Sequence, residues 1–472
     1  MKLKISKDTI AKQPKKYVRL IVTEDPPSWH RLVETKTGQL EYRLGAGKYK
    51  DMTPRKFRLL VRSIVQAAKG HQIEFLALNL PNLTVVSKGS DPLLKNKEWV
   101  VRTIAENLHL AAYEFTAYRT KGKNSKELKE IVICGGLNKK ETTAFKAGEV
   151  VATATNQARD IINTPACDMT PQDLAKAAKS AVAGTKATVK VLGEKELRKL
   201  KMGALLAVGQ GSRNESKLIV IEYWGAGKKA GKPIVLAGKG ITYDTGGLNV
   251  KPSGAMHDMH MDMGGSGAVI GTMAAIAKLK LKKNVVAVIA SAENAVSDKA
   301  MRAGDIVTAM NGMTIEVMHT DAEGRMVLAD ALTYSERFEP KVVLDVATLT
   351  GAALVALGQQ ASAVMTKDEK LQQQLCETGE ESGDYMWPLP LWDEYQPLVK
   401  SARADIANLD SPTNRFGGAI CGGIFLSHFA PKKAKWAHID IAPRMTSAGS
   451  DKLAKGATGE PVRMLVRFIE KS

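Results

Sequence analysis

The chain has 472 residues, more than one ordinary hydrophobic core accommodates, so we expect two domains. Hydrophobic residues make up 44% of it and charged residues 25%, a composition that excludes an intrinsically disordered protein. The formal net charge of +19 fits a phosphate-rich partner, yet the lysines form short scattered clusters without interleaved aromatic residues. A solvated lysine-rich exterior therefore explains the charge better than nucleic-acid binding.

The start of the chain and its cysteines indicate the compartment. Residues 1–7 lack the apolar core and cleavage site of a signal peptide, and no run approaches the ~18 consecutive apolar residues of a membrane helix. The four cysteines are far apart and form no Cys-x-x-Cys pair, which argues against a disulfide framework and a thiolate zinc site. We expect a cytoplasmic protein with reduced thiols at Cys134, Cys167, Cys376 and Cys421.

Residues 1–140 are typical of a smaller N-terminal α/β domain without a catalytic cluster. Strand-like apolar runs occur at 17–22, 73–80 and 131–134, and helical patterns at 54–68 and 95–110. An alanine-rich helical pattern follows over 141–162 and ends at the turn Asn163-Thr164-Pro165. We interpret 141–162 as a linker helix between two domains.

Beyond the linker, buried strand patterns alternate with helical patterns. The expected strands are 189–192, 218–223, 234–237, 285–289, 313–318, 341–347 and 437–441, and the expected helices are 265–277, 325–338 and 418–429. This alternation predicts an α/β fold with a mostly parallel central sheet flanked by helices. Residues 163–472 are expected to form this larger C-terminal domain.

Three polar segments lie near the ends of these strands, where open α/β sheets bind ligands. They are 238–247, 259–265 and the octapeptide 318–325, Met-His-Thr-Asp-Ala-Glu-Gly-Arg. Each alone is weak evidence, because Gly-Gly after Asp is usually a turn and Asp-x-Glu is common on surfaces. Four carboxylates brought together would repel one another unless cations lay among them, so the set suggests a site for divalent metal ions. The carboxylates are Asp244, Asp262, Asp321 and Glu323, with Lys239, Lys251 and Arg325 interspersed.

The order and spacing of these seven side chains closely resembles the leucyl aminopeptidase (cytosol aminopeptidase) family of dinuclear metallopeptidases. The pattern is Lys239-x4-Asp244-x6-Lys251-x10-Asp262-x58-Asp321-x-Glu323-x-Arg325. The resemblance covers residues 150–472 and includes 163–165, 345–351, 436–442 and 456–459. It implies that 163–472 is a catalytic domain. Residues before 150 give little specific signal, as expected of that family's variable N-terminal domain.

The resemblance implies which side chains hold metal. Lys239, Asp244, Asp262 and Glu323 would hold one ion, with Lys239 as a neutral amine. Asp244, Asp321 and Glu323 would hold a second, more exchangeable ion, so that Asp244 and Glu323 bridge the two. The two divalent ions would be manganese or zinc. A water between two such ions has a lowered pKa and becomes a nucleophile near neutral pH.

The resemblance also implies how substrate is handled. Lys251 would polarise the carbonyl and stabilise the oxyanion, and Arg325 would hold a bicarbonate that shuttles protons. Met259, Thr348 and Gly351 would line the pocket for the first side chain of the peptide, which favours leucine and other apolar residues. The implied activity is release of N-terminal amino acids, and the implied assembly is a homohexamer.

Histidines near the carboxylates leave alternatives open. The family's octapeptide usually carries Asn where this chain has His319, which would be an outer hydrogen-bonding side chain or an additional pH-sensitive ligand; the complete ligand set favours the former. For His257 and His260, solvent-facing or outer roles are favoured over coordination. Two other functions stay open. One is a dinuclear phosphoesterase, although such sites usually include several histidine ligands, and the other is a DNA-binding accessory protein, suggested by the net charge.

Overall fold

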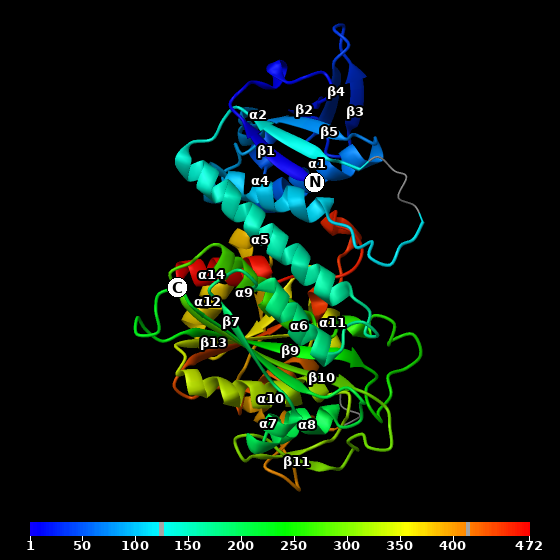
Figure 1. The fold of residues 1–472 in the computed structure, drawn as a ribbon, viewed down its shortest axis with the longest axis vertical. Helices are drawn as coiled ribbons and strands as arrows, with labels where there is room; N and C mark the ends of the chain where they lie inside the picture. The colour runs from blue at the N-terminus through cyan, green and yellow to red at the C-terminus, as the bar shows by residue number, and fades with distance from the viewer. Residues whose placement is uncertain (122–126, 412–415) are drawn as a thin grey trace. The chain divides into compact units, whose positions relative to one another are not determined.

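The computed structural model describes residues 1–121, 127–411 and 416–472, and the chain forms two compact units (Figure 1). The smaller unit is Met1–Asn156 with Ala448–Lys455, and the larger is Gln157–Ser447 with Gly456–Ser472. The helix expected over 141–162 is present as α5 (Lys139–Asn163). In the described part of the chain, no helix is long and apolar enough to cross a membrane.

The smaller unit contains a six-stranded sheet in the order β1-β6-β5-β2-β4-β3, parallel except for the antiparallel β3–β4 pair. Strands β1 and β3 are short, contain no buried residue, and carry basic residues and no apolar run, which is why the sequence patterns missed them. The strands are β1 Lys2–Ser6, β2 Val18–Thr23, β3 His30–Glu34, β4 Leu40–Gly45, β5 Phe75–Asn79 and β6 Glu130–Cys134, and the helices are α1 Pro54–Gly70, α2 Leu80–Val85, α3 Pro92–Lys95 and α4 Lys97–Ala112.

The larger unit is built on an eight-stranded sheet in the order β15-β14-β17-β13-β9-β10-β8-β7. Its centre, β17-β13-β9-β10, is parallel, and the antiparallel pairs lie toward the edges. The α/β fold with a mostly parallel central sheet is therefore confirmed. The strands are β7 Thr188–Leu192, β8 Lys217–Trp224, β9 Ile234–Asp244, β10 Asn284–Asn294, β13 Val342–Ala347, β14 Ser362–Met365, β15 Met386–Pro388 and β17 Lys435–Asp440.

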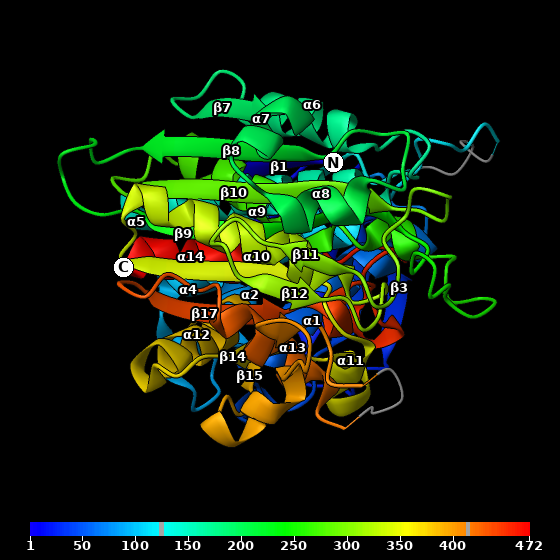
Figure 2. The same ribbon diagram turned by 90° about the horizontal axis from the view of Figure 1, so that it is seen from below.

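Helices cover both faces of this sheet (Figure 2). The central strands β9 and β10 are buried on both faces and carry apolar runs in their first halves, as expected for parallel strands between two helical layers. Helix α9 packs so close to β13 that position 265 requires glycine. A Cβ on Gly265 would lie 2.0 Å from the Val346 carbonyl oxygen. The helices are α6 Pro171–Ala181, α7 Glu194–Lys199, α8 Gly203–Gly209, α9 Gly264–Lys278, α10 Glu323–Ser335, α11 Gly351–Leu357, α12 Glu369–Ser382, α13 Gly418–Ser427 and α14 Val462–Lys471.

Two strand predictions near the polar segments were wrong in length. The strand expected over 234–237 continues to Asp244, because residues 238–241 pair with β10 instead of forming a loop. The strand expected over 313–318 is only β12 (Thr314–Glu316), which lies in a small separate sheet with β11 (Ile306–Thr308) and β16 (Ile406–Ala407). The octapeptide therefore follows β12 as a turn and leads into α10.

Candidate metal centre

Lys239 and Asp244 both lie on β9, and a β-bulge brings them to the same face. Side chains alternate along a regular strand, so residues five positions apart would point to opposite faces. Between the pairs Ala292–Ile241 and Asn294–Asp244, β10 advances two residues while β9 advances three. The extra residue in β9 reverses the alternation and aims Asp244 to the side of Lys239.

Asp262 reaches this lysine from the segment between a short 3-10 turn, η3 (Met259–Met261), and α9. Lys239 Nζ donates to Asp262 Oδ1 at 2.8 Å, and the Thr348 hydroxyl donates to the same oxygen at 2.8 Å. The Thr348 carbonyl in turn accepts from Lys239 Nζ at 3.0 Å. Thr348, which follows β13, thus fixes the lysine and the carboxylate together.

Glu323 is the first residue of α10, and its side chain meets Lys239 Nζ at 3.0 Å. Glycine at the next position permits this approach, because a Cβ on Gly324 would lie 2.5 Å from Lys239 Cε. Asp330 anchors the helix from within, accepting hydrogen bonds from the amides of Leu205 and Met310 at 2.8 Å each. The position of Glu323 is therefore determined by buried packing of the whole helix.

The remaining predicted side chains complete the cluster. Lys251 Nζ lies 2.8 Å from Asp244 Oδ2 and 2.5 Å from Asp321 Oδ1. Asn249 holds the turn that carries Asp321. Its side-chain Oδ1 accepts from the Thr320 backbone amide at 2.8 Å, and its backbone amide donates to the Thr320 hydroxyl at 2.8 Å. The structure thus brings together all six of the lysines and carboxylates that the spacing pattern singled out.

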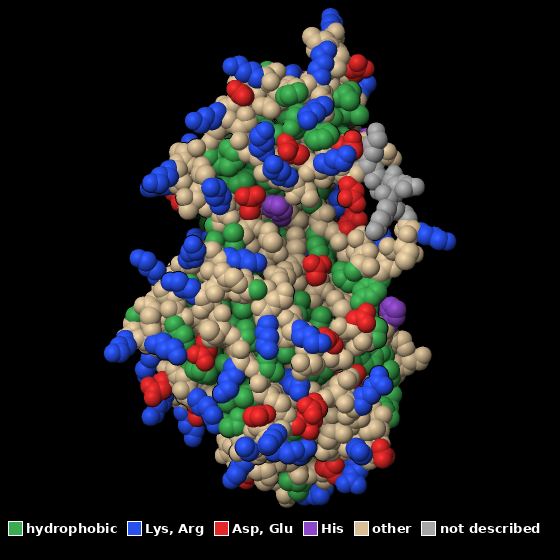
Figure 3. All heavy atoms as spheres, viewed as in Figure 1, with side chains coloured by type: hydrophobic (Ala, Val, Ile, Leu, Met, Phe, Trp, Pro, Cys, Tyr) green, Lys and Arg blue, Asp and Glu red, His purple; other side chains and the backbone are tan. Residues whose placement is uncertain are grey.

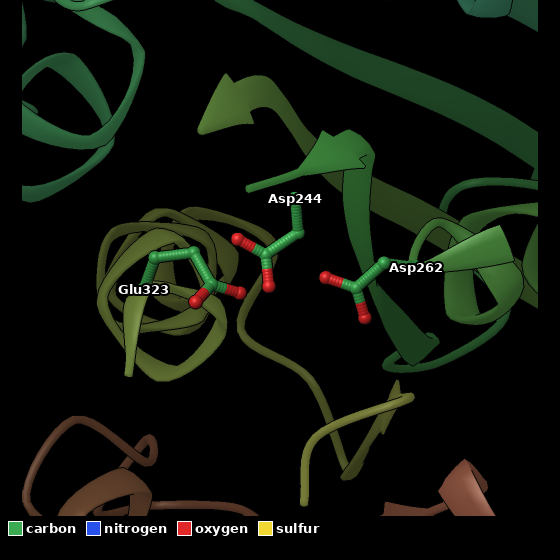
Figure 4. A group of neighbouring side chains, drawn as sticks. All are labelled: Asp244, Asp262 and Glu323. Carbon is green, nitrogen blue, oxygen red and sulfur yellow. The ribbon is translucent and has the colours of Figure 1, made fainter. Parts of the chain in front are cut away.

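Three buried carboxylates lie close enough to share a metal ion. Oxygens of Asp244, Asp262 and Glu323 are all within 4.8 Å of one another, and the side chains point toward a common centre (Figure 4). Burial raises the pKa of Asp262 to about 8 and that of Glu323 to about 7; neighbouring carboxylates add to the shift, and Lys239 opposes it. Burial also raises the pKa of Asp321 to about 6. Such mutual destabilisation of negative charge favours binding of a cation.

The two lysines provide positive charge within the cluster. Burial disfavours the ammonium form of Lys239, but Asp262, Glu323 and Asp244 outweigh it and hold its pKa above the ordinary value. Burial likewise disfavours the ammonium form of Lys251, but the neighbouring carboxylates outweigh it and raise the pKa of Lys251. Among the described residues, the buried Glu323 Oε2 makes no hydrogen bond, whereas Oε1 lies 3.0 Å from Lys239 Nζ. The donor set therefore fits a divalent ion.

Arg325 is buried beside this cluster, and no carboxylate of the described residues pairs with it. Its Nη1 donates to the Asn408 carbonyl oxygen at 2.7 Å and to Cys421 Sγ at 3.3 Å, and its Nε has no hydrogen-bond partner. Within the described ranges, no Asp or Glu forms an ion pair with it. A buried cation without a counterion favours a bound anion.

The other predicted residues lie nearby with different surroundings. Thr348 directs its hydroxyl at Asp262, whereas Met259 is half-buried in η3 and Gly351 is exposed at the start of α11. His319 Nδ1 accepts a hydrogen bond from the Asp321 amide at 3.3 Å. Burial, followed by the charge of Lys251, lowers the pKa of His319. In the structure, His319 is therefore a hydrogen-bond acceptor for the backbone of the octapeptide.

Sequence reasoning missed the amide side chains that hold the site. Asn294 donates to Asp244 Oδ1 at 2.8 Å and to the Thr320 carbonyl at 3.1 Å, and so connects β10 to both halves of the cluster. Asn249 holds the octapeptide turn, as described above. Uncharged amides give no spacing pattern, and the signal that could have found Asn294 is its position at the end of a buried strand.

Known proteins resemble the chain over almost its whole length. The model of the cytosol aminopeptidase family, catalytic domain, matches residues 156–466, and that of the family's N-terminal domain matches residues 42–122. The chain belongs to the cytosol aminopeptidase family. It is therefore a peptidase of the aminopeptidase type, and the resemblance seen in the sequence is confirmed.

Individual relatives agree with this assignment. "Probable cytosol aminopeptidase" of Shewanella loihica is 42% identical over 431 residues, covering 90% of this chain and 83% of its own. The protein of the same name from Azotobacter vinelandii is 44% identical over 430 residues, covering 90% and 84%. Among solved structures, the bottromycin maturation enzyme BotP in complex with Mn is 30% identical with a TM-score of 0.86, covering 97% of this chain and 99% of its own.

Proposed function

We propose that this family member is a metal-dependent aminopeptidase that releases N-terminal residues, preferably leucine and other apolar ones, with two divalent ions. The observation that carries the proposal is the buried triad Asp244, Asp262 and Glu323, whose oxygens lie within 4.8 Å of one another. Bound manganese or zinc would supply a bridging water of lowered pKa and a Lewis acid for the scissile carbonyl. The triad contains no histidine, which favours a peptidase over a phosphoesterase.

We assign the ligands as two overlapping sets. Lys239, Asp244, Asp262 and Glu323 would hold one ion, and Asp244, Asp321 and Glu323 the other. Glu323 Oε2 supports a bridging role, because it is buried and makes no hydrogen bond among the described residues. Lys239 would lose a proton to become a ligand, so that binding of metal releases a proton.

Lys251 and Arg325 would act without binding metal. The Lys251 ammonium group would neutralise the negative charge that develops on the carbonyl oxygen in the transition state. Arg325 would hold bicarbonate, which fits a buried guanidinium with a free Nε and no carboxylate partner among the described residues. Met259, Thr348 and Gly351 would border the pocket for the N-terminal side chain. Gly351 supports this, because a Cβ built on it meets no atom within 4 Å.

The test joins metal analysis to hydrolysis of a leucyl anilide. The full chain should bind two equivalents of manganese and lose activity on chelation, and added manganese should restore it. Asp262→Asn should lose one equivalent of manganese and the activity, whereas Asp258→Asn, at an exposed carboxylate on the same segment, should keep both equivalents and the activity. Activity that survives complete metal removal would overturn the proposal.

We further propose that the enzyme is a cytoplasmic homohexamer that acts in peptide catabolism. The word cytosol in the names of its relatives supports the compartment, and the family resemblance supports the assembly. Sedimentation of the purified full chain measures the mass of the assembly directly. A monomer at micromolar concentration would contradict the hexamer without affecting the proposed chemistry.

A further inference from the structure

Asn408 lies directly after β16, far along the chain from the octapeptide, and is fully buried. Its backbone amide donates to the Glu316 carbonyl at 3.0 Å, continuing the pairing of β16 with β12. This pairing sets the asparagine beside the backbone that leaves β12. The octapeptide begins two residues after Glu316.

The Asn408 side chain then binds the backbone of the octapeptide. Its Oδ1 accepts from the amides of Met318 at 2.8 Å and His319 at 3.3 Å. Its Nδ2 donates to the carbonyl oxygens of His319 at 2.8 Å and Ala322 at 3.4 Å. One side chain thus satisfies backbone groups on both sides of Asp321, a segment that pairs with none of the described strands.

The Asn408 backbone holds the end of the same segment. Its carbonyl oxygen accepts from Arg325 Nη1 at 2.7 Å. On the opposite side of the turn, Thr320 donates from its hydroxyl to the Gly246 carbonyl at 2.5 Å and accepts from Asn249 at 2.8 Å. The turn is therefore held from two sides, and Asp321 projects between them toward Lys251.

We propose that Asn408 is a positioning residue that sets the octapeptide turn, and with it Asp321, for the more exchangeable metal ion. This inference rests on the proposed function. The chemistry requires asparagine: it places a donor and an acceptor at one end of a short side chain, whereas aspartate offers no donor and leucine offers neither. Within the described part of the chain, the hydrogen bonds of Asn408 do not reach Lys239, Asp244 or Asp262, and these three side chains have their own support from β9 and Thr348.

The test measures metal binding apart from activity. In calorimetric titration with manganese, Asn408→Ala should weaken the second equivalent about 10- to 100-fold, as for other residues that orient metal ligands, and leave the first unchanged. Asn408→Asp, which keeps the shape and the acceptors, should show the same pattern. Activity at saturating peptide should fall in proportion to occupancy of the second site and recover at high manganese.

A control separates positioning from general destabilisation. Asn284 is also buried and also holds a loop through its amide, donating to the carbonyls of Gly227 at 2.8 Å and Gly231 at 3.1 Å, at the opposite end of β10. Asn284→Ala should lower Tm yet bind both equivalents as the wild type does. Unchanged binding of both equivalents in Asn408→Ala and Asn408→Asp would overturn the inference. Wild-type protein that binds no manganese would instead overturn the proposed function.

Discussion

Replacement of Lys251 by methionine should separate metal binding from turnover. The Lys251 ammonium lies 2.8 Å from Asp244 and 2.5 Å from Asp321, and its side chain is 15% exposed. At an effective dielectric constant of about 20, a unit charge pair at this distance attracts by about 6 kcal/mol before the cost of desolvation. An incoming divalent ion must compete with that attraction, so removing the ammonium should leave manganese affinity unchanged or increased.

The effect on catalysis should have the opposite sign. Loss of a group that stabilises a developing oxyanion costs about 3 to 4 kcal/mol, a factor of about 10² to 10³ in kcat. Methionine retains much of the length of the lysine stem, so packing changes little. Both quantities are measurable on one preparation: manganese titration by calorimetry and steady-state hydrolysis of a leucyl anilide.

A matched control is Lys299→Met, at an exposed lysine in the loop after β10. It should leave both quantities unchanged. A near-wild-type kcat in Lys251→Met would refute the oxyanion role. Loss of manganese from that variant would instead show that Lys251 supports the ligands.

Three further changes test the surroundings of the cluster. Burial raises the pKa of Asp330 to about 7, so the folded protein retains a proton that the unfolded chain releases near pH 4, and stability falls as pH rises between these values. In urea unfolding at a series of pH values, Asp330→Asn should reduce the fall of the free energy of unfolding with pH by up to about 1.4 kcal/mol per pH unit. An unaltered pH dependence would contradict the raised pKa of Asp330. Thr348→Val removes the 2.8 Å hydrogen bond to Asp262 and should weaken manganese binding about 10-fold, whereas Thr348→Ser should not. His319→Asn should keep full manganese stoichiometry, because His319 accepts from the Asp321 amide; loss of one equivalent would make it a ligand.

The charged part of the site was predictable from the sequence, but its geometry was not. Lys239 and Asp244 were identified by residue type and spacing, while their common face depends on a bulge defined by pairing with β10. Register with a strand distant in sequence leaves no local pattern. The same holds for Asn408, whose importance arises only because β16 pairs with β12.

The fold was predictable where apolar runs were long and uninterrupted. Strands β9, β10 and β13 are buried on both faces, and their positions were recognised even where their ends were not. Strand β14 and its edge neighbour β15 were missed because they are short and β15 contains Pro388. The lysine-rich composition is visible as basic side chains spread over the surface shown in Figure 3, interspersed with acidic ones.

The two lysines inside the carboxylate cluster have a consequence for how the enzyme is assembled in a cell. Lys239 and Lys251 offset part of the negative charge of the acidic side chains with charges that belong to the chain itself. Under the proposed function, the chain would therefore fold before an ion binds, and a metal ion would later replace a proton of the cluster. Activity would then track the metal supply of the cell at constant protein abundance.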